Sequence, residues 1–103
     1  MTIRKYPNLK LFEDDAEVTK GESWVYSISV SGDGANADID IYDGIDKTAA
    51  TKKFHFETLS GTTISTNLKH PAHFREGIYI DTNATTSKIT VEWSNGAEPL
   101  PPY

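Results

Sequence analysis

Hydrophobic and polar residues alternate along most of the chain with a period of two. The longest run starts at Trp24, from which apolar or aromatic side chains alternate with mostly polar ones as far as Val30. Alternation of this kind is typical of a β-strand that buries one face and exposes the other. It predicts that Trp24 and Tyr26 face the core, as does Trp93 at the end of the last run. Similar runs occupy residues 37–42, 54–56, 64–68, 78–80 and 89–93, and weaker ones occupy residues 9–12 and 16–20.

Turn-forming residues separate these runs. Glycines, alone or next to Asp or Asn, recur at positions 21, 32–34, 43–44, 61 and 95–96, and such residues accept the backbone angles of tight turns. No stretch carries the apolar stripe of a helix. The sequence therefore predicts an all-β fold, a single antiparallel β-sandwich of about seven or eight strands. A jelly-roll-like and an immunoglobulin-like strand order both fit, because both produce the same alternation.

The chain has 103 residues, which suits one domain with a modest core. We expect residues 1–15 to form an N-terminal arm or first strand, residues 16–95 to form the sandwich, and residues 96–103 to form a proline-rich tail. Prolines lack the N–H that a central strand needs. The tail should therefore be extended, and either disordered or docked on a neighbouring molecule.

The net charge of −5 is unevenly distributed: residues 1–12 hold basic groups and no acidic ones, whereas residues 13–46 are strongly acidic. Nucleic-acid binding needs clustered Lys and Arg, so we expect no nucleic-acid partner. No apolar run has the length that spans a bilayer, so we expect no membrane partner. The first residues lack an apolar leader segment, which predicts a protein that is not secreted. The candidate partner-binding residues lie in the basic arm and the tail: Arg4, Lys5, Tyr6, Pro99, Pro101, Pro102 and Tyr103.

An acidic cluster suggests a cation site. Asp38 and Asp40 fall on the outward face of one predicted strand, and Asp43 follows at its end. Carboxylate oxygens are the ligands that calcium prefers, so these three residues are candidate calcium ligands, although the spacing of an EF-hand loop is missing. The alternative is a charged solvent face that discourages edge-to-edge strand pairing.

The histidines give a second metal pattern. His70 and His73 are spaced so that two imidazoles can reach one ion, but a complete site would need further ligands. Pro71 between them favours a turn. We therefore expect both to be loop histidines without a ligand role, and we expect no cofactor.

Recognised catalytic patterns are missing from the sequence: no serine sits in a nucleophile elbow and no glycine loop is built for phosphate. We expect a protein that is not an enzyme. Tyr42 and Tyr79 fall on the outward faces of their predicted strands, and exposed tyrosines can stack on sugars or on a protein partner. They are candidate glycan-binding residues, so a carbohydrate-binding module used in surface attachment is the alternative function.

Turn glycines and core positions form a series in the middle of the chain: IYDG at 41–44, KFHF at 53–56, GTTIS at 61–65, PAHFREGIYI at 71–80 and SKITV at 87–91. In this series the chain resembles small β-sandwich virion proteins of tailed phages, of the head decoration or head and tail accessory type. The resemblance implies a virion component that is made in the host cytoplasm and has no catalytic residues. It also implies self-association, or binding to capsid or tail proteins, through terminal arms that make assembly contacts.

Overall fold

The computed structural model describes residues 6–46, 51–83, 85 and 87–100. These residues form strands, turns and loops and no helix, which confirms the predicted all-β fold. The strands are β1 (Asn8–Phe12), β2 (Ala16–Lys20), β3 (Ser23–Gly32), β4 (Ala37–Asp43), β5 (Thr51–Thr58), β6 (Thr63–Phe74), β7 (Gly77–Asp81) and β8 (Ser87–Asn95).

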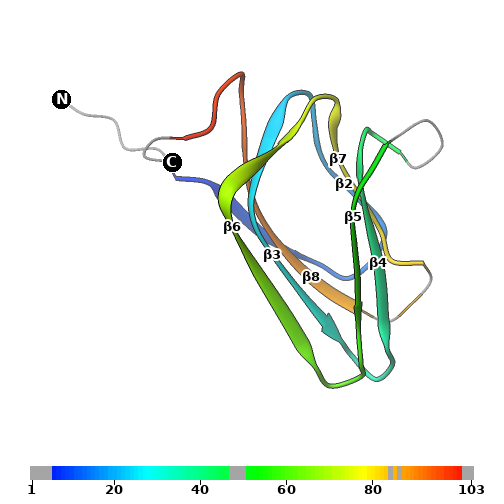
Figure 1. The fold of residues 1–103 in the computed structure, drawn as a ribbon. Coiled ribbons are helices and arrows are strands. Elements are labelled where there is room, and N and C mark those ends of the chain that lie inside the picture. Colours follow the sequence, from blue (N-terminus) through cyan, green and yellow to red (C-terminus); the bar gives the residue numbers. More distant parts are fainter. Residues whose placement is uncertain (1–5, 47–50, 84, 86, 101–103) are drawn as a thin grey trace.

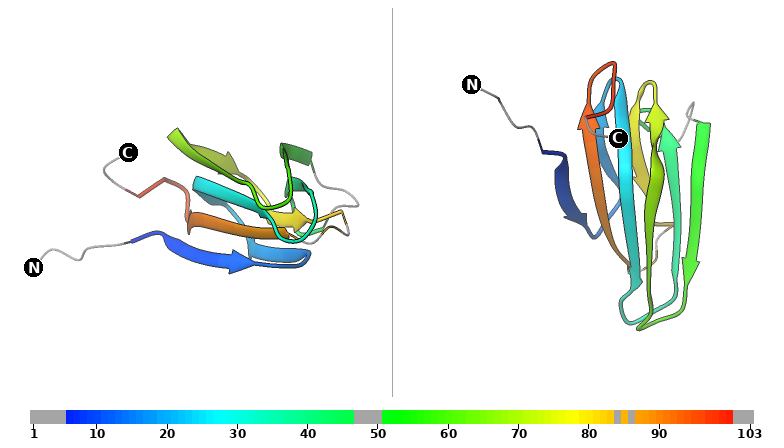
Figure 2. Two further views of the ribbon diagram at one scale, coloured as in Figure 1. Left: turned by 90° about the horizontal axis from the view of Figure 1, so that it is seen from below. Right: turned by 60° about the vertical axis from the view of Figure 1, so that its left-hand side comes forward.

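The strands form two antiparallel four-stranded sheets that pack face to face as a sandwich (Figures 1 and 2). The first sheet has the order β1-β8-β3-β6 and the second has the order β2-β7-β4-β5. The strand pairs are nested, because β1 pairs with β8, β2 with β7, β3 with β6, and β4 with β5. The chain is therefore one long two-stranded ribbon that turns back between β4 and β5 and is rolled into two sheets. This nested order is that of a jelly roll. In the immunoglobulin order the first two strands are neighbours in one sheet, which is not the case here.

The core lies between the two sheets and is built from alternate residues of the strands. Ile39 and Ile41 of β4, and Ile78 and Ile80 of β7, are fully buried. Burying a side chain of this size stabilises the fold by about 1.5–3 kcal/mol. The buried core comprises Phe12, Val25, Ile28, Val30, Ala37, Ile39, Ile41, Phe74, Ile78, Ile80, Ile89, Val91 and Trp93.

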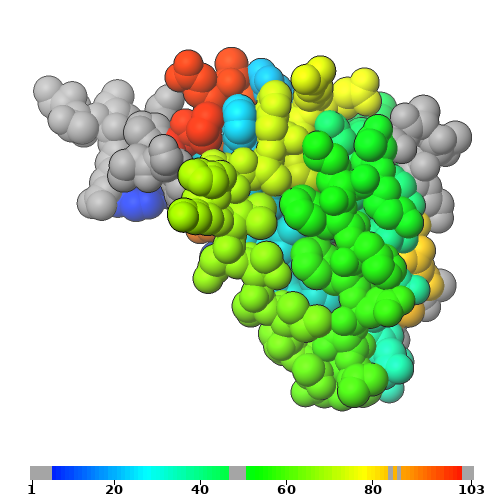
Figure 3. All heavy atoms as spheres, in the orientation of Figure 1, coloured from blue at the N-terminus to red at the C-terminus, as the bar shows by residue number. Residues whose placement is uncertain are grey.

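Along one edge of the sandwich, β5 of the second sheet lies beside β6 of the first (Figure 3). Aromatic side chains join the two strands there. Phe54 of β5 stacks on the buried Phe74 of β6, with 6.2 Å between the ring centroids, and Phe56 stacks on Phe54. Such ring pairs contribute about 0.5–1.5 kcal/mol beyond the area that they bury. The two sheets are thus tied together along this edge without a backbone ladder between them.

A β-bulge in β3 reverses the faces of this strand. The residue pairs on either side of Tyr26 show that Tyr26 is an extra residue in β3 relative to β8. One extra residue shifts the alternation by one position. Before the bulge, Val25 rather than Trp24 therefore points into the core, opposite Trp93. The prediction that Trp24 faces the core is wrong, whereas the prediction for Trp93 is confirmed. Tyr26 is buried, as predicted, but it does not belong to the main core cluster.

Tyr26 is buried at 3% exposure, but outside the core cluster, because the C-terminal segment covers it. Its hydroxyl lies 2.6 Å from Ser94 Oγ and accepts a hydrogen bond of 2.8 Å from the backbone N–H of Leu100. The backbone N–H of Gly96 also donates to the carbonyl of Glu22. The described part of the tail, residues 96–100, therefore packs on this chain's own β3 and the turn before it. The expectation of a tail that is disordered or docked on a neighbour is wrong for these residues.

His70, Pro71 and His73 lie within β6 and not in a turn. β6 is an edge strand of the first sheet, and its pairing with β3 is interrupted between Asn67 and Ala72. A proline is tolerated at such a place because no neighbouring strand needs its missing N–H. The expected turn at this position, with two loop histidines, is therefore wrong.

Candidate functional site

The residues best suited to bind a metal ion or a small ligand lie together on the outer face of the second sheet. Because the inward residues of β4 are Ile39 and Ile41, the alternate residues Asp38, Asp40 and Tyr42 lie on the outer face. This face therefore holds most of the residues that the sequence indicates as calcium or glycan ligands.

Four polar residues form a square across β4 and β5. In the register of these antiparallel strands, Asp38 lies opposite Glu57 and Asp40 lies opposite His55. The Nε2 atom of His55 lies 3.2 Å from Glu57 Oε1 and 3.6 Å from Asp38 Oδ1. The Nδ1 atom of the same ring lies 2.6 Å from Asp40 Oδ1. One imidazole is thus in contact with three carboxylates.

Asp40 is the buried member of the square, since its side chain is only 8% exposed. Asn83 donates a hydrogen bond of 3.0 Å to Asp40 Oδ2, and the ammonium of Lys52 lies 3.3 Å from Oδ1. Burial acts to raise the pKa of Asp40, but the hydrogen bonds from Asn83, His55 and Lys52 outweigh it and hold the pKa below its ordinary value. Asp40 therefore stays ionised and fixes the ring of His55.

The carboxylates act on His55 in turn. The hydrogen bond to Asp40, followed by that to Glu57, raises the pKa of His55 above its ordinary value. The hydrogen bond that Lys52 donates to Asp40 likewise raises the pKa of Lys52. The described square and its lysine are therefore held together by mutual charge compensation on a face that is open to solvent.

Asp43 does not belong to this cluster. Its two carboxylate oxygens accept hydrogen bonds from the backbone N–H groups of Arg75 and Glu76, at 3.0 and 2.8 Å. It therefore caps the turn between β6 and β7. The structure brings Asp38 and Asp40 together, as expected, but it assigns Asp43 to a turn and adds His55 and Glu57, which sequence reasoning did not select.

Tyr42 and Tyr79 are direct neighbours on the same outer face, since they are opposite residues of β4 and β7. Both are half-buried, and the ammonium of Lys52 lies 5.9 Å from the centroid of the Tyr42 ring. The expectation that both tyrosines lie on outward faces is confirmed. The structure also places them side by side, which periodicity alone does not give.

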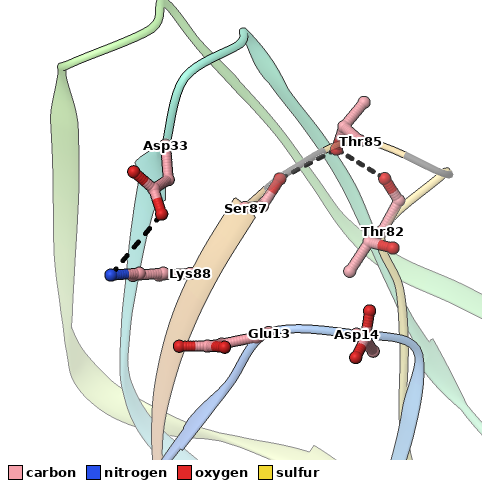
Figure 4. A pocket seen from close by; sticks show the side chains of 7 residues that line it. All are labelled: Glu13, Asp14, Asp33, Thr82, Thr85, Ser87 and Lys88. Atoms are coloured by element: carbon pink, nitrogen blue, oxygen red, sulfur yellow. Dashed lines mark hydrogen bonds and ion pairs between the residues drawn. The ribbon is translucent and has the colours of Figure 1, made fainter.

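Two hollows flank the β7–β8 connection. One, of about 530 Å³, borders the square and is lined by Asn36, Ala37, Asp38, Glu57, Thr58, Leu59 and Thr85. The other, of about 380 Å³, is drawn in Figure 4 and is lined by Glu13, Asp14, Asp33, Thr82, Thr85, Ser87 and Lys88. In this second hollow Lys88 pairs with Asp33 at 3.5 Å, and Thr85 bonds to Ser87 and to the carbonyl of Thr82. Most of its polar groups are thus already engaged with one another.

The residues expected to bind partners are only partly described. Tyr6 is 70% exposed just before β1, and Pro99 is half-buried in the docked tail. The remaining ones lie outside the described residues: Arg4, Lys5, Pro101, Pro102 and Tyr103.

β1 is an edge strand with an unusual surface. It pairs with β8 on one side, and no strand within the described residues pairs with its other side. Leu9 and Leu11 are 67% and 50% exposed, and only Phe12 of this strand is buried. Edge strands are usually protected from pairing by charged residues or proline. The other edge strands carry such residues: Glu17 and Lys20 on β2, Lys52 and Lys53 on β5, and Lys69 and Pro71 on β6. β1 carries Lys10 alone, so it is the least protected of the four edges.

Comparisons with known proteins give no assignment, because no protein-family model, curated protein or solved structure matches this chain. Within the described part of the chain there is no helix long and apolar enough to cross a membrane.

Proposed function

We propose that the protein is a non-enzymatic structural component of a phage virion, of the capsid decoration or head and tail accessory type. It acts through protein–protein assembly contacts, and its first contact is the outer edge of β1. The observation that carries this proposal is the pair of exposed leucines, Leu9 and Leu11, on a strand whose outer edge no described strand pairs with. An edge of this kind adds a strand from a partner at little cost, because main-chain hydrogen bonds supply affinity and the leucines supply buried area.

The occupant that best fits this edge is β1 of a second copy. The residues before β1 are basic, with Arg4 and Lys5, whereas Glu13, Asp14 and Asp15 follow it. In an antiparallel pair of identical strands, the start of one strand meets the end of the other. Self-pairing of β1 therefore sets a basic segment against an acidic one, and opposite charges across a strand pair are favourable.

A register exists that avoids a clash of like charges. With Leu9 opposite Leu9 of the partner, Lys10 lies opposite Asn8 of the partner rather than opposite another lysine. The contact is then symmetric about a two-fold axis, which is the commonest arrangement of identical subunits. It extends the first sheet from one copy into the next.

Two further features support the virion assignment. The series of motifs between residues 41 and 91 resembles small tailed-phage virion proteins, and the jelly roll is a frequent fold of viral capsid domains. The second feature is an analogy at the level of fold. A small rigid sandwich that is present in many copies also gains binding strength from weak contacts that repeat.

The mass of the untagged chain in solution, measured by light scattering over a range of concentrations, tests the contact. We expect a dimer for the native chain and a monomer for Leu9→Lys and Leu11→Lys. The matched control is Leu59→Lys, because Leu59 is 68% exposed, like Leu9, but lies outside the strands. Circular dichroism checks that each variant folds.

A native chain that stays monomeric at every concentration would overturn self-pairing, as would equal effects of Leu9→Lys and Leu59→Lys. The virion assignment is tested separately by mass spectrometry of purified phage particles that carry the gene. It fails if the particles lack the protein.

One observation favours a second candidate, a carbohydrate-binding module. The adjacent rings of Tyr42 and Tyr79 give a two-residue aromatic platform beside carboxylates, and such rings can stack on sugars. A glycan array probed with the native chain and with Tyr42→Ala tests this candidate. Reproducible binding that Tyr42→Ala removes would support it, and the lack of any binding would exclude it.

A further inference from the structure

The square on the outer face of the second sheet is more ordered than a group of solvated surface charges. It combines an imidazole with carboxylates, and it holds three donor atoms close together. His55, Asp38 and Glu57 each offer one such atom, and all three atoms lie within 4.8 Å of one another. Residues 55 and 57 alternate on β5, so both point to the outer face, and Asp38 lies directly opposite Glu57.

The spacing of these atoms suits a small divalent cation. Zinc binds imidazole nitrogen and carboxylate oxygen at about 2.0–2.2 Å, and in tetrahedral geometry its ligand atoms are then about 3.4 Å apart. The distances from His55 Nε2 to Glu57 Oε1 and to Asp38 Oδ1 are 3.2 and 3.6 Å, on either side of that value. Both carboxylate oxygens therefore already lie close to ligand spacing from the imidazole nitrogen.

The ring of His55 is also prepared for this role. Asp40 contacts Nδ1 at 2.6 Å, which keeps a ring proton on Nδ1, so a cation that displaces the Nε2 proton meets the Nε2 lone pair beside Asp38 and Glu57. A carboxylate behind a metal-binding histidine is the usual arrangement in protein metal sites, because it fixes both tautomer and orientation. Asp40 is itself held by Asn83 and Lys52.

The fourth side of the cluster is open. His55 and Asp38 are 46% and 44% exposed, Glu57 is 71% exposed, and the hollow of about 530 Å³ borders both acidic residues. Water or a side chain of a partner can therefore complete the coordination. The imidazole also decides the type of metal, because calcium takes oxygen ligands whereas imidazole suits zinc and related transition metals.

We propose that Asp38, His55 and Glu57 form a binding site for a zinc-class divalent cation, with Asp40 as the residue that positions His55. The site lies on a different sheet from the β1 edge and does not depend on the proposed assembly. It has three protein ligands, fewer than a closed structural zinc site, so the ion is exchangeable and accessible from solvent.

Isothermal titration of the full-length, untagged chain with zinc chloride tests this site. We expect one zinc ion per chain and little competition from calcium. Two pairs of variants separate the site from ordinary surface binding. His55→Gln should remove binding, whereas His70→Gln, at an exposed histidine of β6, should leave it unchanged. Asp38→Asn should weaken binding, whereas Asp43→Asn on the same strand should not, because Asp43 caps a turn.

Asp40→Asn distinguishes the positioning role. Loss of a residue that orients a metal ligand typically weakens metal binding by about 10- to 100-fold, so we expect a weakening in this range while the ratio of one zinc per chain is kept. Proton NMR of the His55 ring gives a second readout, since its signals should change on addition of zinc while those of His70 stay in place.

Equal zinc binding by the native chain and His55→Gln would overturn the proposal, as would saturation only by several weakly bound ions per chain. Circular dichroism of each variant excludes misfolding as the cause of a loss.

Discussion

Trp24 stacks on His73 across the β3–β6 pair, with the ring centroids 4.2 Å apart and the ring planes 18° apart. The indole Nε1 donates a hydrogen bond to the carbonyl of Gly96, and His73 Nε2 lies 2.6 Å from Glu22 Oε2. These contacts join β3, β6 and the start of the tail on the outer surface of the first sheet. Trp24, which the alternation pattern predicts to be a core residue, therefore lies on the outside of the sandwich, where it connects β3, β6 and the tail.

The two tryptophans should differ sharply when they are truncated. Trp93→Ala removes a buried core side chain and should cost about 3–5 kcal/mol of the free energy of unfolding. Trp24→Ala removes an outer stack and one hydrogen bond, and should cost about 1–2 kcal/mol. Chemical denaturation of both variants measures the difference. Equal losses would mean that the indole of Trp24 carries as much of the stability as a core residue.

The indole N–H of Trp93 is buried and has no hydrogen-bond partner among the described residues. A buried donor without a partner costs free energy, so Trp93→Phe removes a penalty together with some packing volume. We expect its cost to stay below about 1.5 kcal/mol, far from that of Trp93→Ala. Denaturation of the two variants side by side provides the check, and similar losses would contradict the expectation.

The hydroxyl of Tyr26 should stabilise the docked tail. Tyr26→Phe leaves the N–H of Leu100 and the hydroxyl of Ser94 without their shared partner, and should cost about 1–3 kcal/mol. Removal of residues 97–103 should cost a similar amount, because it uncovers Tyr26. Combining both changes should cost less than the sum, since each of them removes the hydrogen bond between Leu100 and Tyr26. Full additivity in denaturation experiments would show that the tail and the hydroxyl act separately.

Asp43 should contribute to stability and not to binding. Asp43→Ala removes the acceptor for two backbone N–H groups of the β6–β7 turn, and should cost about 1–2 kcal/mol, as the loss of a cap does. The matched control is Asp14→Ala, at an exposed carboxylate in the β1–β2 connection, which should stay within about 0.5 kcal/mol of the native chain. Thermal unfolding of both variants measures this contrast.

The pair of His55 and Asp40 should make stability depend on pH in metal-free buffer. Because the folded pKa of His55 is raised, its contribution is fully present below the ordinary value of about 6.5 and is lost as the pH rises through the raised value. The folded pKa of Asp40 is lowered, so its contribution is present above the ordinary value and is lost as the pH falls through the lowered one. NMR titration of the His55 ring should show the raised midpoint, and Asp40→Asn should lower it. An unchanged midpoint in Asp40→Asn would contradict this coupling.

The fold class could be predicted from the sequence because alternation reports directly which face of a strand is buried. Ile39 and Ile41 are clear examples, since both are fully buried. The prediction for Trp24 failed because one extra residue, Tyr26, reverses which side chains of β3 face the core. The sequence of the strand alone does not reveal this bulge. Pro71 was misplaced because a proline marks either a turn or an unpaired edge, and only the strand order distinguishes the two.

The candidate site was harder to predict because it depends on pairing between strands. Asp38 and Asp40 alternate on one strand, and His55 and Glu57 alternate on another, so both outward pairs are visible in the sequence. Their meeting depends on the register that sets Asp38 opposite Glu57, and no local signal fixes that register. The available signal was the presence of two outward polar pairs, Asp38/Asp40 and His55/Glu57, on consecutive strands. Such pairs suggest a register in which they lie opposite each other.

The nested pairing of the strands also sets an order for folding. The β4–β5 pair closes a short loop, whereas the β1–β8 pair joins residues as distant as Asn8 and Trp93. Each strand pair that forms shortens the loop that the next strand pair must close. Strand pairing should therefore proceed from the β4–β5 pair toward the two ends of the chain. β1 is then the last strand to be added, and Phe12 is its one side chain in the core. The strand that carries the assembly edge is thus added to the sandwich late in folding, and a single buried side chain anchors it to the core.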